Sequence, residues 1–305
     1  MKKVLLASTA LVMSAGFAAA DVSVGGDGRM GIIGGGTDDT ATATVDETDL
    51  AFTSRIRISF AASGETDAGL AFGGSVRVDN YEDDQATNGT EGSVFVEGTF
   101  GKISMGDVSG APEAAVGDLS GVGLTGLGDY NELTYLSNGE RPAARWDYVT
   151  GDLGLHVSAD NPGAADDTYG VAVTYSTGGI SLGLGYEDSD ALDTGHIVAG
   201  VTAALGDATV KLVYGDADDI GFTQYGASVD FVTGATTVTA FWRTADVDGV
   251  ADGDAYGIGV SYDLGGGAAI KAGYVDGDDI SDPLDAAFAT ELEDGRYDFG
   301  ISMSF

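Results

Sequence analysis

The sequence predicts an all-β fold, an antiparallel transmembrane β-barrel of sixteen strands. The clearest observation is the end of the chain, residues 296–305, where a large apolar residue occupies every second position. The apolar set is Tyr297, Phe299, Ile301, Met303 and Phe305. Because side chains alternate between the two faces of a strand, this strand has one apolar face up to its final residue. Outer-membrane barrels need such strands, apolar toward lipid and polar toward the lumen. A membrane pore is therefore the leading hypothesis.

The other end of the chain predicts export. Lys2 and Lys3 precede an apolar stretch, residues 4–13, and the small residues 18–20 follow. This order is typical of a secretory signal peptide, so we expect residues 1–20 to be cleaved and the barrel to comprise residues 21–305. No apolar run approaches the roughly 20 residues that a membrane-spanning helix needs.

Composition limits the class of partner. Without Lys2 and Lys3, 11 basic residues remain against 49 acidic ones, a net charge of −38. Nucleic-acid phosphates repel such a chain, so we expect no nucleic-acid partner. Disorder is not expected, because 43% of the residues are hydrophobic, whereas disordered chains have low hydrophobicity. The 50 glycines indicate many strands and turns.

Sixteen segments show the strand alternation. Their ranges are 22–33, 50–62, 70–81, 92–100, 102–108, 143–150, 153–160, 168–176, 180–188, 196–205, 209–214, 222–232, 236–246, 255–264, 269–275 and 296–305. In the second segment, for example, Phe52, Ile56 and Phe60 share the outward face, and Arg55 and Arg57 point inward. The inward residues of most segments are small and polar, which suits a water-filled lumen.

Short and long connections alternate along the chain. Short turns are expected at Gly101 and at 151–152, 177–179, 206–207, 233–235 and 265–267, with longer acidic loops such as 276–295 between them. This is the arrangement of an up-and-down outer-membrane barrel. A large soluble sandwich or barrel is the alternative, but its polar face would carry more lysine than this chain has.

The longest connection, residues 109–142, contains no strong strand. Apolar residues recur through it, which predicts packing against another part of the protein: Val116, Leu119, Val122, Leu124, Leu127, Leu133 and Leu136. Loops of this length are usually functional or disordered. We expect this segment, the constriction loop, to fold into the barrel rather than to extend outside it.

Basic side chains concentrate on the first strands. By the alternation, five of them point into the lumen: Arg29, Arg55, Arg57, Arg77 and Lys102. Carboxylates of the constriction loop would face them, and the opposed charges would create a transverse field that discriminates solutes by charge and dipole. The alternative is that these cations only pair with Asp27, Asp79 or Glu97 to solvate the lumen.

Five stretches resemble the Rhodobacter-type general porins of alphaproteobacteria. They are 21–30, Ser54-Arg55-Ile56-Arg57, 64–73, 100–107 and 261–267. The resemblance covers essentially the whole chain and implies a sixteen-stranded homotrimeric barrel whose long third loop folds inward and forms an eyelet. It implies wall cations at Arg29, Arg55, Arg57 and Arg77, and loop carboxylates at Glu113, Asp118, Asp129 and Glu132.

Motifs for catalysis or metal binding are weak. His156 and His196 lack the spacing of metal ligands, and no nucleophile elbow is present, so we expect no enzyme activity and no required cofactor. Acidic residues crowd four loops, and such oxygen-rich segments are candidate Ca²⁺ sites. They are Asp38, Asp39, Asp46 and Glu47; Glu82, Asp83 and Asp84; Asp246, Asp248, Asp252 and Asp254; and Asp276, Asp278, Asp279 and Asp282.

Three function hypotheses follow. The first is a passive pore of the cell outer membrane for small hydrophilic solutes and ions, in contact with lipid and lipopolysaccharide. The second is a plugged outer-membrane barrel that acts as a receptor or adhesin, and the third is a soluble secreted calcium-binding β protein.

Tyr and Trp mark the lipid headgroup belts of outer-membrane barrels, yet between residues 21 and 108 the only Tyr or Trp is Tyr81. We therefore expect the first five strands to form the trimer contact.

Overall fold

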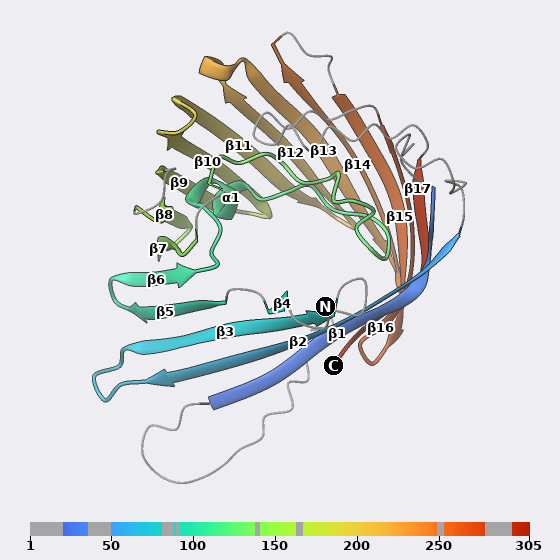
Figure 1. The fold of residues 1–305 in the computed structure, drawn as a ribbon, viewed down its shortest axis with the longest axis horizontal. Coiled ribbons are helices and arrows are strands. Elements are labelled where there is room, and N and C mark those ends of the chain that lie inside the picture. The colour runs from blue at the N-terminus through green and yellow to red at the C-terminus, as the bar shows by residue number, and fades with distance from the viewer. Residues whose placement is uncertain are drawn as a thin grey trace.

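One antiparallel sheet closes on itself to form a barrel (Figure 1). The computed structural model describes residues 21–35, 50–80, 88–89, 92–137, 141–162, 167–248, 253–277 and 295–305. The first strand pairs with both the second and the last strand of the chain, which closes the ring. The sheet has 17 elements, but two consecutive ones, β4 and β5, pair with the same neighbour β3 and share one position. The barrel is therefore sixteen-stranded, as predicted.

The strands agree with the predicted segments to within a few residues. They are β1 (Asp21–Gly34), β2 (Ala51–Glu65), β3 (Ala71–Asn80), β4 (Asn88–Gly89), β5 (Ser93–Gly98), β6 (Gly101–Gly106), β7 (Ala143–Thr150), β8 (Leu153–Ala159), β9 (Thr168–Thr177), β10 (Ile180–Ser189), β11 (Thr194–Leu205), β12 (Ala208–Ala217), β13 (Phe222–Thr233), β14 (Thr236–Val247), β15 (Gly253–Gly265), β16 (Ala268–Gly277) and β17 (Arg296–Ser304). The helices are α1 (Ala111–Val116) and the 3₁₀ turn η1 (Asp218–Ile220). Among the described residues, no helix is long and apolar enough to cross a membrane.

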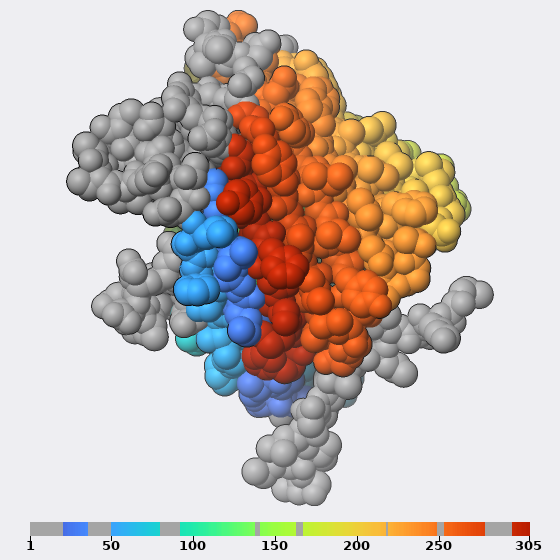
Figure 2. Space-filling view, turned by 90° about the vertical axis from the view of Figure 1, so that its right-hand side faces the viewer, coloured from blue at the N-terminus to red at the C-terminus, as the bar shows by residue number. Residues whose placement is uncertain are grey.

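The outer surface of the barrel is apolar. Residues Val171, Ile258 and Phe299 are 52%, 55% and 53% exposed, and the residues beside them in sequence point inward and are buried or partly buried. Figure 2 shows this outer surface where β15–β17 continue into β1 and β2. The burial pattern confirms the predicted outward and inward faces of these strands.

The short turns are glycine turns. Gly206 and Gly234 have φ values of 69° and 62°, a left-handed conformation that only glycine adopts without strain. One predicted turn was misplaced by two residues: the connection between β5 and β6 is Thr99-Phe100, and Gly101 already belongs to β6. Gly101 pairs with Gly98 there.

The C-terminal residue completes the closure. The N–H of Phe305 donates to the Gly26 carbonyl oxygen at 3.0 Å, and the N–H of Gly26 donates to the Phe305 carbonyl oxygen at 2.7 Å. A Cβ at Gly26 would lie 2.9 Å from the Phe305 ring. Part of the small-residue surface on β1 is therefore filled by the chain's own last side chain.

The constriction loop lies inside the barrel and forms its hydrophobic core. Figure 1 shows α1 and the segment after it within the ring of strands, along the β9–β15 wall. All seven apolar loop residues of the predicted set are buried. Five of them, Val116, Leu119, Val122, Leu127 and Leu133, form one cluster with inward-facing wall residues: Val198, Val213, Phe241, Ala255 and Val275. The inward fold is confirmed.

The helix α1 was not predicted. Its sequence, Ala-Pro-Glu-Ala-Ala-Val, has proline in the first turn and is followed by Gly117 at the C-cap, both of which are typical helix end signals. Six residues are too few for an amphipathic pattern, because one turn takes 3.6 residues. The packing of Pro112 and Val116 on the wall stabilises the helix instead.

Candidate functional site

Three of the predicted wall arginines lie on adjacent strands with carboxylates beside them. Arg57 and Arg77 share Asp79, with Nε to Oδ2 and Oδ1 distances of 3.0 and 2.8 Å. Arg55 lies 3.5 Å from Asp27 through Nη2 and Oδ1. The wall therefore carries three cations and two carboxylates in one cluster, a net positive charge. The predicted pairing with Asp27 and Asp79 is present, and the transverse field across the passage stays a prediction.

Arg29 has a different position from the other three. It is only 8% exposed, and its Nη1 donates to the Thr125 carbonyl oxygen of the constriction loop at 3.0 Å. Its charge lies beneath the loop rather than on an open wall. The structure thus assigns Arg29 to holding the loop.

The four predicted loop carboxylates divide into two environments. The Glu113 side chain on α1 accepts a hydrogen bond from Ser109 Oγ at 2.8 Å, and Asp118 accepts one from the Leu133 N–H at 2.8 Å. Asp129 and Glu132 belong to consecutive turns after Gly126, and Asp129 adopts a left-handed φ of 58°. The loop thus brings four acidic groups within electrostatic range of one another.

Burial and the charges of neighbouring acids raise the pKa of Glu113, Asp118 and Glu132. Burial is the main cause at Glu113 and Asp118, where it raises the pKa above the ordinary value. Glu132 is the extreme case: desolvation by surrounding protein, followed by the charges of Asp129, Asp118 and Glu113, raises its pKa to about 7. The Glu132 side chain is nevertheless exposed.

We expect the ion selectivity to depend on pH near neutrality. Glu132 is neutral below its raised pKa of about 7 and negative above it, so cation preference should increase as the pH rises through that value. Reversal potentials measured in a KCl gradient from about pH 6 to about pH 8 report this change. Glu132→Gln should flatten the profile, whereas Glu65→Gln, at an exposed turn, should not. A profile that persists in Glu132→Gln would assign the titration to another group.

Asp298 of β17 fixes the middle of the loop. Its carboxylate accepts the backbone N–H of Leu124 (2.8 and 2.9 Å), the N–H of Thr125 (2.6 Å) and the Thr125 hydroxyl (2.8 Å). Asp298 is 3% exposed. Because buried backbone donors need partners, this carboxylate replaces the pairing that the irregular loop backbone lacks.

Glu187 and Gln224 fix the end of the loop. Glu187 accepts the N–H groups of Leu136 (2.7 Å) and Ser137 (3.2 Å) and the Ser137 hydroxyl (2.7 Å). Gln224 accepts the Thr134 N–H at 2.9 Å and donates to the Thr134 carbonyl oxygen at 2.7 Å. His196 lies between the two, with Nδ1 2.8 Å from Glu187 Oε1. Glu187, Gln224 and His196 are fully buried.

A row of inward glycines lies beneath the loop. A Cβ at Gly185 would be 2.6 Å from Pro112, and one at Gly226 would be 2.6 Å from Leu119. The wall glycines of this row are Gly31, Gly170, Gly183, Gly185, Gly200, Gly226, Gly259, Gly273 and Gly300, each with a loop atom within about 3 Å of an added Cβ. The sequence analysis assigned small inward residues to an open lumen. For this row the interpretation was wrong, because the loop covers these positions.

Comparisons with known proteins agree on one family. The family model for Gram-negative porins matches residues 7–282. A porin of Rhodobacter capsulatus is 36% identical over 298 residues, which cover 85% of this chain and 95% of that protein. The chain belongs to the Gram-negative porins.

Other porins are similar along nearly the same length. A porin of Fuscovulum blasticum is 26% identical over 297 residues, 82% of this chain and 93% of that protein. A solved porin structure refined at 1.8 Å matches with a TM-score of 0.75 and 30% identity over 93% of this chain and 100% of its own. Engineered Rhodopseudomonas blastica porin, at 22% identity and a TM-score of 0.67 over the same shares, has the same fold.

Sequence reasoning missed the residues that hold the porin loop. Glu187, Gln224 and Asp298 are large polar side chains at inward positions, and Gly185, Gly226 and Gly300 stand two residues away on the same face. A large polar residue two positions from a glycine, on the lumen face of a strand, is therefore a usable signal for a loop contact.

The metal hypothesis stays a prediction. Within the described ranges, no group of three or more His, Asp or Glu side chains could hold a metal ion. Most of the acidic residues proposed for Ca²⁺, among them 38–39, 46–47, 82–84 and 278–282, lie outside the described residues, as do residues 1–20.

Proposed function

We propose that this porin is a passive diffusion channel of the outer membrane for small hydrophilic solutes and ions. The observation that carries the proposal is a closed barrel with a loop fixed inside it against the β8–β17 side. A loop held on one side leaves the other side, β2–β6, as the opposite wall of the passage. Solutes would pass between the loop carboxylates Glu113, Asp118, Asp129 and Glu132 and the arginines of β2 and β3.

The channel should prefer cations weakly. Without Lys2 and Lys3 the chain has a net charge of −38, and a negative potential at the mouths enriches cations. Arg55, Arg57 and Arg77 oppose this inside the barrel, and salt screens the mouth charges. The outer surface would contact lipid, and the loop end would contact lipopolysaccharide.

Conductance in a planar bilayer tests the function. The purified protein should produce stable conductance steps in KCl, with a modest cation preference that shrinks as the salt concentration rises. Bovine serum albumin, added in the same detergent, is the control. A folded protein that inserts and gives no steps contradicts the proposal and favours a plugged barrel.

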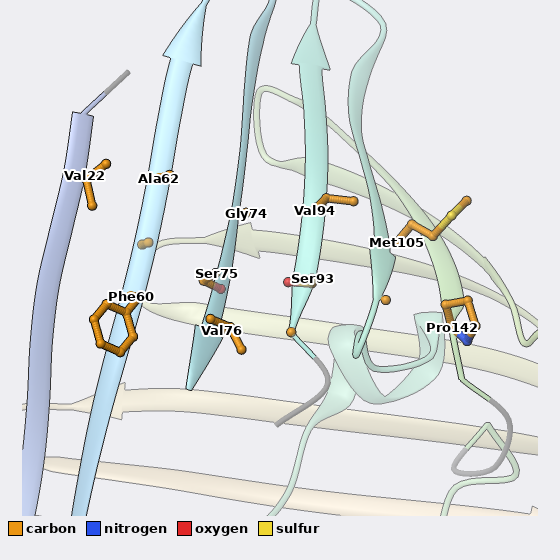
Figure 3. Close-up of a pocket in the computed structure, with 13 residues that line it drawn as sticks. Val22, Phe60, Ala62, Gly74, Ser75, Val76, Ser93, Val94, Met105 and Pro142 are labelled. Carbon is orange, nitrogen blue, oxygen red and sulfur yellow. The ribbon is translucent and has the colours of Figure 1, made fainter. Parts of the chain in front are cut away.

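The outer face of β1–β6 is the proposed trimer contact. It contains an apolar hollow of about 690 Å³, and Figure 3 shows Phe60, Val76, Val94 and Met105 around it. Glycines at its floor, such as Gly74, leave room for side chains of a second copy. A surface that lacks Tyr and Trp but contains such a hollow is better suited to contact with another protein subunit than with lipid headgroups.

Val24→Arg should dissociate the trimer and leave the barrel folded. Val24 is 59% exposed on β1, and a desolvated arginine in a subunit contact lacks a partner. Val171→Arg on β9, where Val171 is 52% exposed, is the matched control and should keep the trimer, at a lipid-face cost of about 2–4 kcal/mol. Light scattering in detergent measures the mass. A trimer in Val24→Arg and a monomer in Val171→Arg would place the contact elsewhere.

A further inference from the structure

A recess of about 230 Å³ opens between α1 and the lumen face of β8–β11. One side is formed by the second half of α1, residues 114–116, and the other by inward-facing wall residues. The polar wall residues are His156, Thr174, Ser176, Ser181 and Thr202. Ser176 and Ser181 are next to the short turn of β9 and β10, so the recess lies toward the short-turn end of the barrel.

Glycines of the wall let α1 pack directly against it along one edge of this recess. A Cβ at Gly200 would be 2.8 Å from Val116, and one at Gly183 would meet the Ala115 carbonyl oxygen. Lys211 Nζ, from β12, donates to the carbonyl oxygens of Val116 and Asp118, both at 2.6 Å. The helix end is therefore held at a defined distance from the wall, and the recess is a fixed part of the lumen.

The hydrogen-bonding groups of the recess are uncharged hydroxyls and one imidazole. Ser176 Oγ and Ser181 Oγ are 2.9 Å apart, and His156 Nε2 is 3.3 Å from Thr174 Oγ1. His156 Nδ1 lies 2.7 Å from Asp147 Oδ1, which leaves Nε2 as the ring nitrogen on the side of Thr174. No carboxylate, ammonium or guanidinium group is among the residues that line this recess.

This chemistry selects neutral solutes. A hydroxyl both donates and accepts, so four of them can exchange hydrogen bonds with the hydroxyls of a solute in several orientations. An ion entering the recess would lose hydration without meeting an opposite charge, which costs free energy. The apolar residues Ala114, Ala115 and Val116 can cover the C–H surface of a small ring. The volume is below the roughly 300–1,000 Å³ of pockets for drug-sized ligands, which limits the occupant to one small molecule.

We propose that this recess is a binding subsite for a neutral polyhydroxylated solute, a monosaccharide or a polyol of similar size. The inference rests on the proposed diffusion function, because the solute reaches the recess through the lumen. The subsite lies outside the charged passage between the loop carboxylates and the arginines, and it gives the channel a second basis for selectivity besides charge.

The test uses the purified porin in planar bilayers with KCl on both sides. D-glucose should lower the conductance and add current noise beyond the change in bulk conductivity, and the effect should saturate with concentration. The double variant Ser181→Ala/Thr202→Val should reduce the glucose effect to the bulk level while keeping the conductance in KCl alone. Thr53→Val, a hydroxyl loss on β2 away from the recess, should keep the full effect.

The outcomes separate this inference from the proposed function. Absence of conductance steps in KCl contradicts the diffusion function itself. Normal steps with only a bulk effect of glucose overturn the subsite alone. An equal, saturating effect of gluconate, the charged analogue, overturns its preference for neutral solutes. A double variant that retains the glucose effect assigns the binding to another part of the lumen.

Discussion

Asp298→Ala should release the middle of the constriction loop and give a larger, noisier channel. The substitution leaves three loop donors without their acceptor: the N–H groups of Leu124 and Thr125 and the Thr125 hydroxyl. Each unsatisfied buried group costs about 1–3 kcal/mol. Moving into the lumen water, where these donors can bond water molecules, therefore lowers the free energy of the loop. Arg29 alone then holds Thr125, which is too little to keep one loop conformation.

Single-channel recordings measure this effect through the mean conductance and the open-channel noise. Asp230→Ala is the matched control, because Asp230 contacts the loop only through the Ser120 hydroxyl, at 2.6 Å. Its effect should be much smaller. If Asp298→Ala and the unmodified channel give the same conductance and noise, the carboxylate does not position the loop.

Arg55→Ala/Arg57→Ala should increase the cation preference several-fold. The change removes two positive charges and also exposes the carboxylates of Asp27 and Asp79 that they pair with. A unit charge about 10 Å from an ion contributes about 0.4 kcal/mol in bulk water, a factor of about two in the local ion concentration. Two lost cations therefore predict a change of about fourfold at low ionic strength, reduced by screening at high salt.

Reversal potentials in a KCl gradient measure the preference directly. Lys271→Ala is the control, since Lys271 points inward from β16, which lies three strands away from β2 around the ring. It should shift the potential less than either arginine substitution does alone. An unchanged reversal potential in the double variant would show that Arg55 and Arg57 do not line the ion path.

The strands were predictable because the alternation of apolar and polar residues continues over most of each strand. Residues 143–150 were predicted to the residue, and errors elsewhere occur at strand ends, where turn residues such as Thr99 and Phe100 have no periodic signal. The inward fold of the loop was also predictable, because its recurrent apolar residues need a partner surface. The helix α1 was not, since a single short turn depends on contacts made far along the chain.

The loop contacts could not be derived from sequence for the same reason. Thr125 and Asp298 are 173 residues apart, and Leu136 and Glu187 are 51 apart. Only the closed barrel brings these pairs together. Charge alone indicated Arg29 as a wall cation, but burial and a hydrogen bond to the loop distinguish it from Arg55, Arg57 and Arg77. The alternation of side chains along a strand predicts whether a residue points inward or outward, but it does not predict which part of the protein packs against that residue.

The glycine row makes the position of the loop depend on the side chains of the barrel wall. A single methyl group at Gly185 or Gly226 would clash with the loop and displace it from the wall, without any change in the loop sequence. Porins adapting to larger or differently charged solutes therefore have two independent routes. One changes the side chains that the loop presents, and the other changes the floor on which it rests. Variants of this chain selected for altered permeability should consequently carry substitutions at wall glycines far from the loop in sequence, such as Gly226, where an added Cβ would meet Leu119.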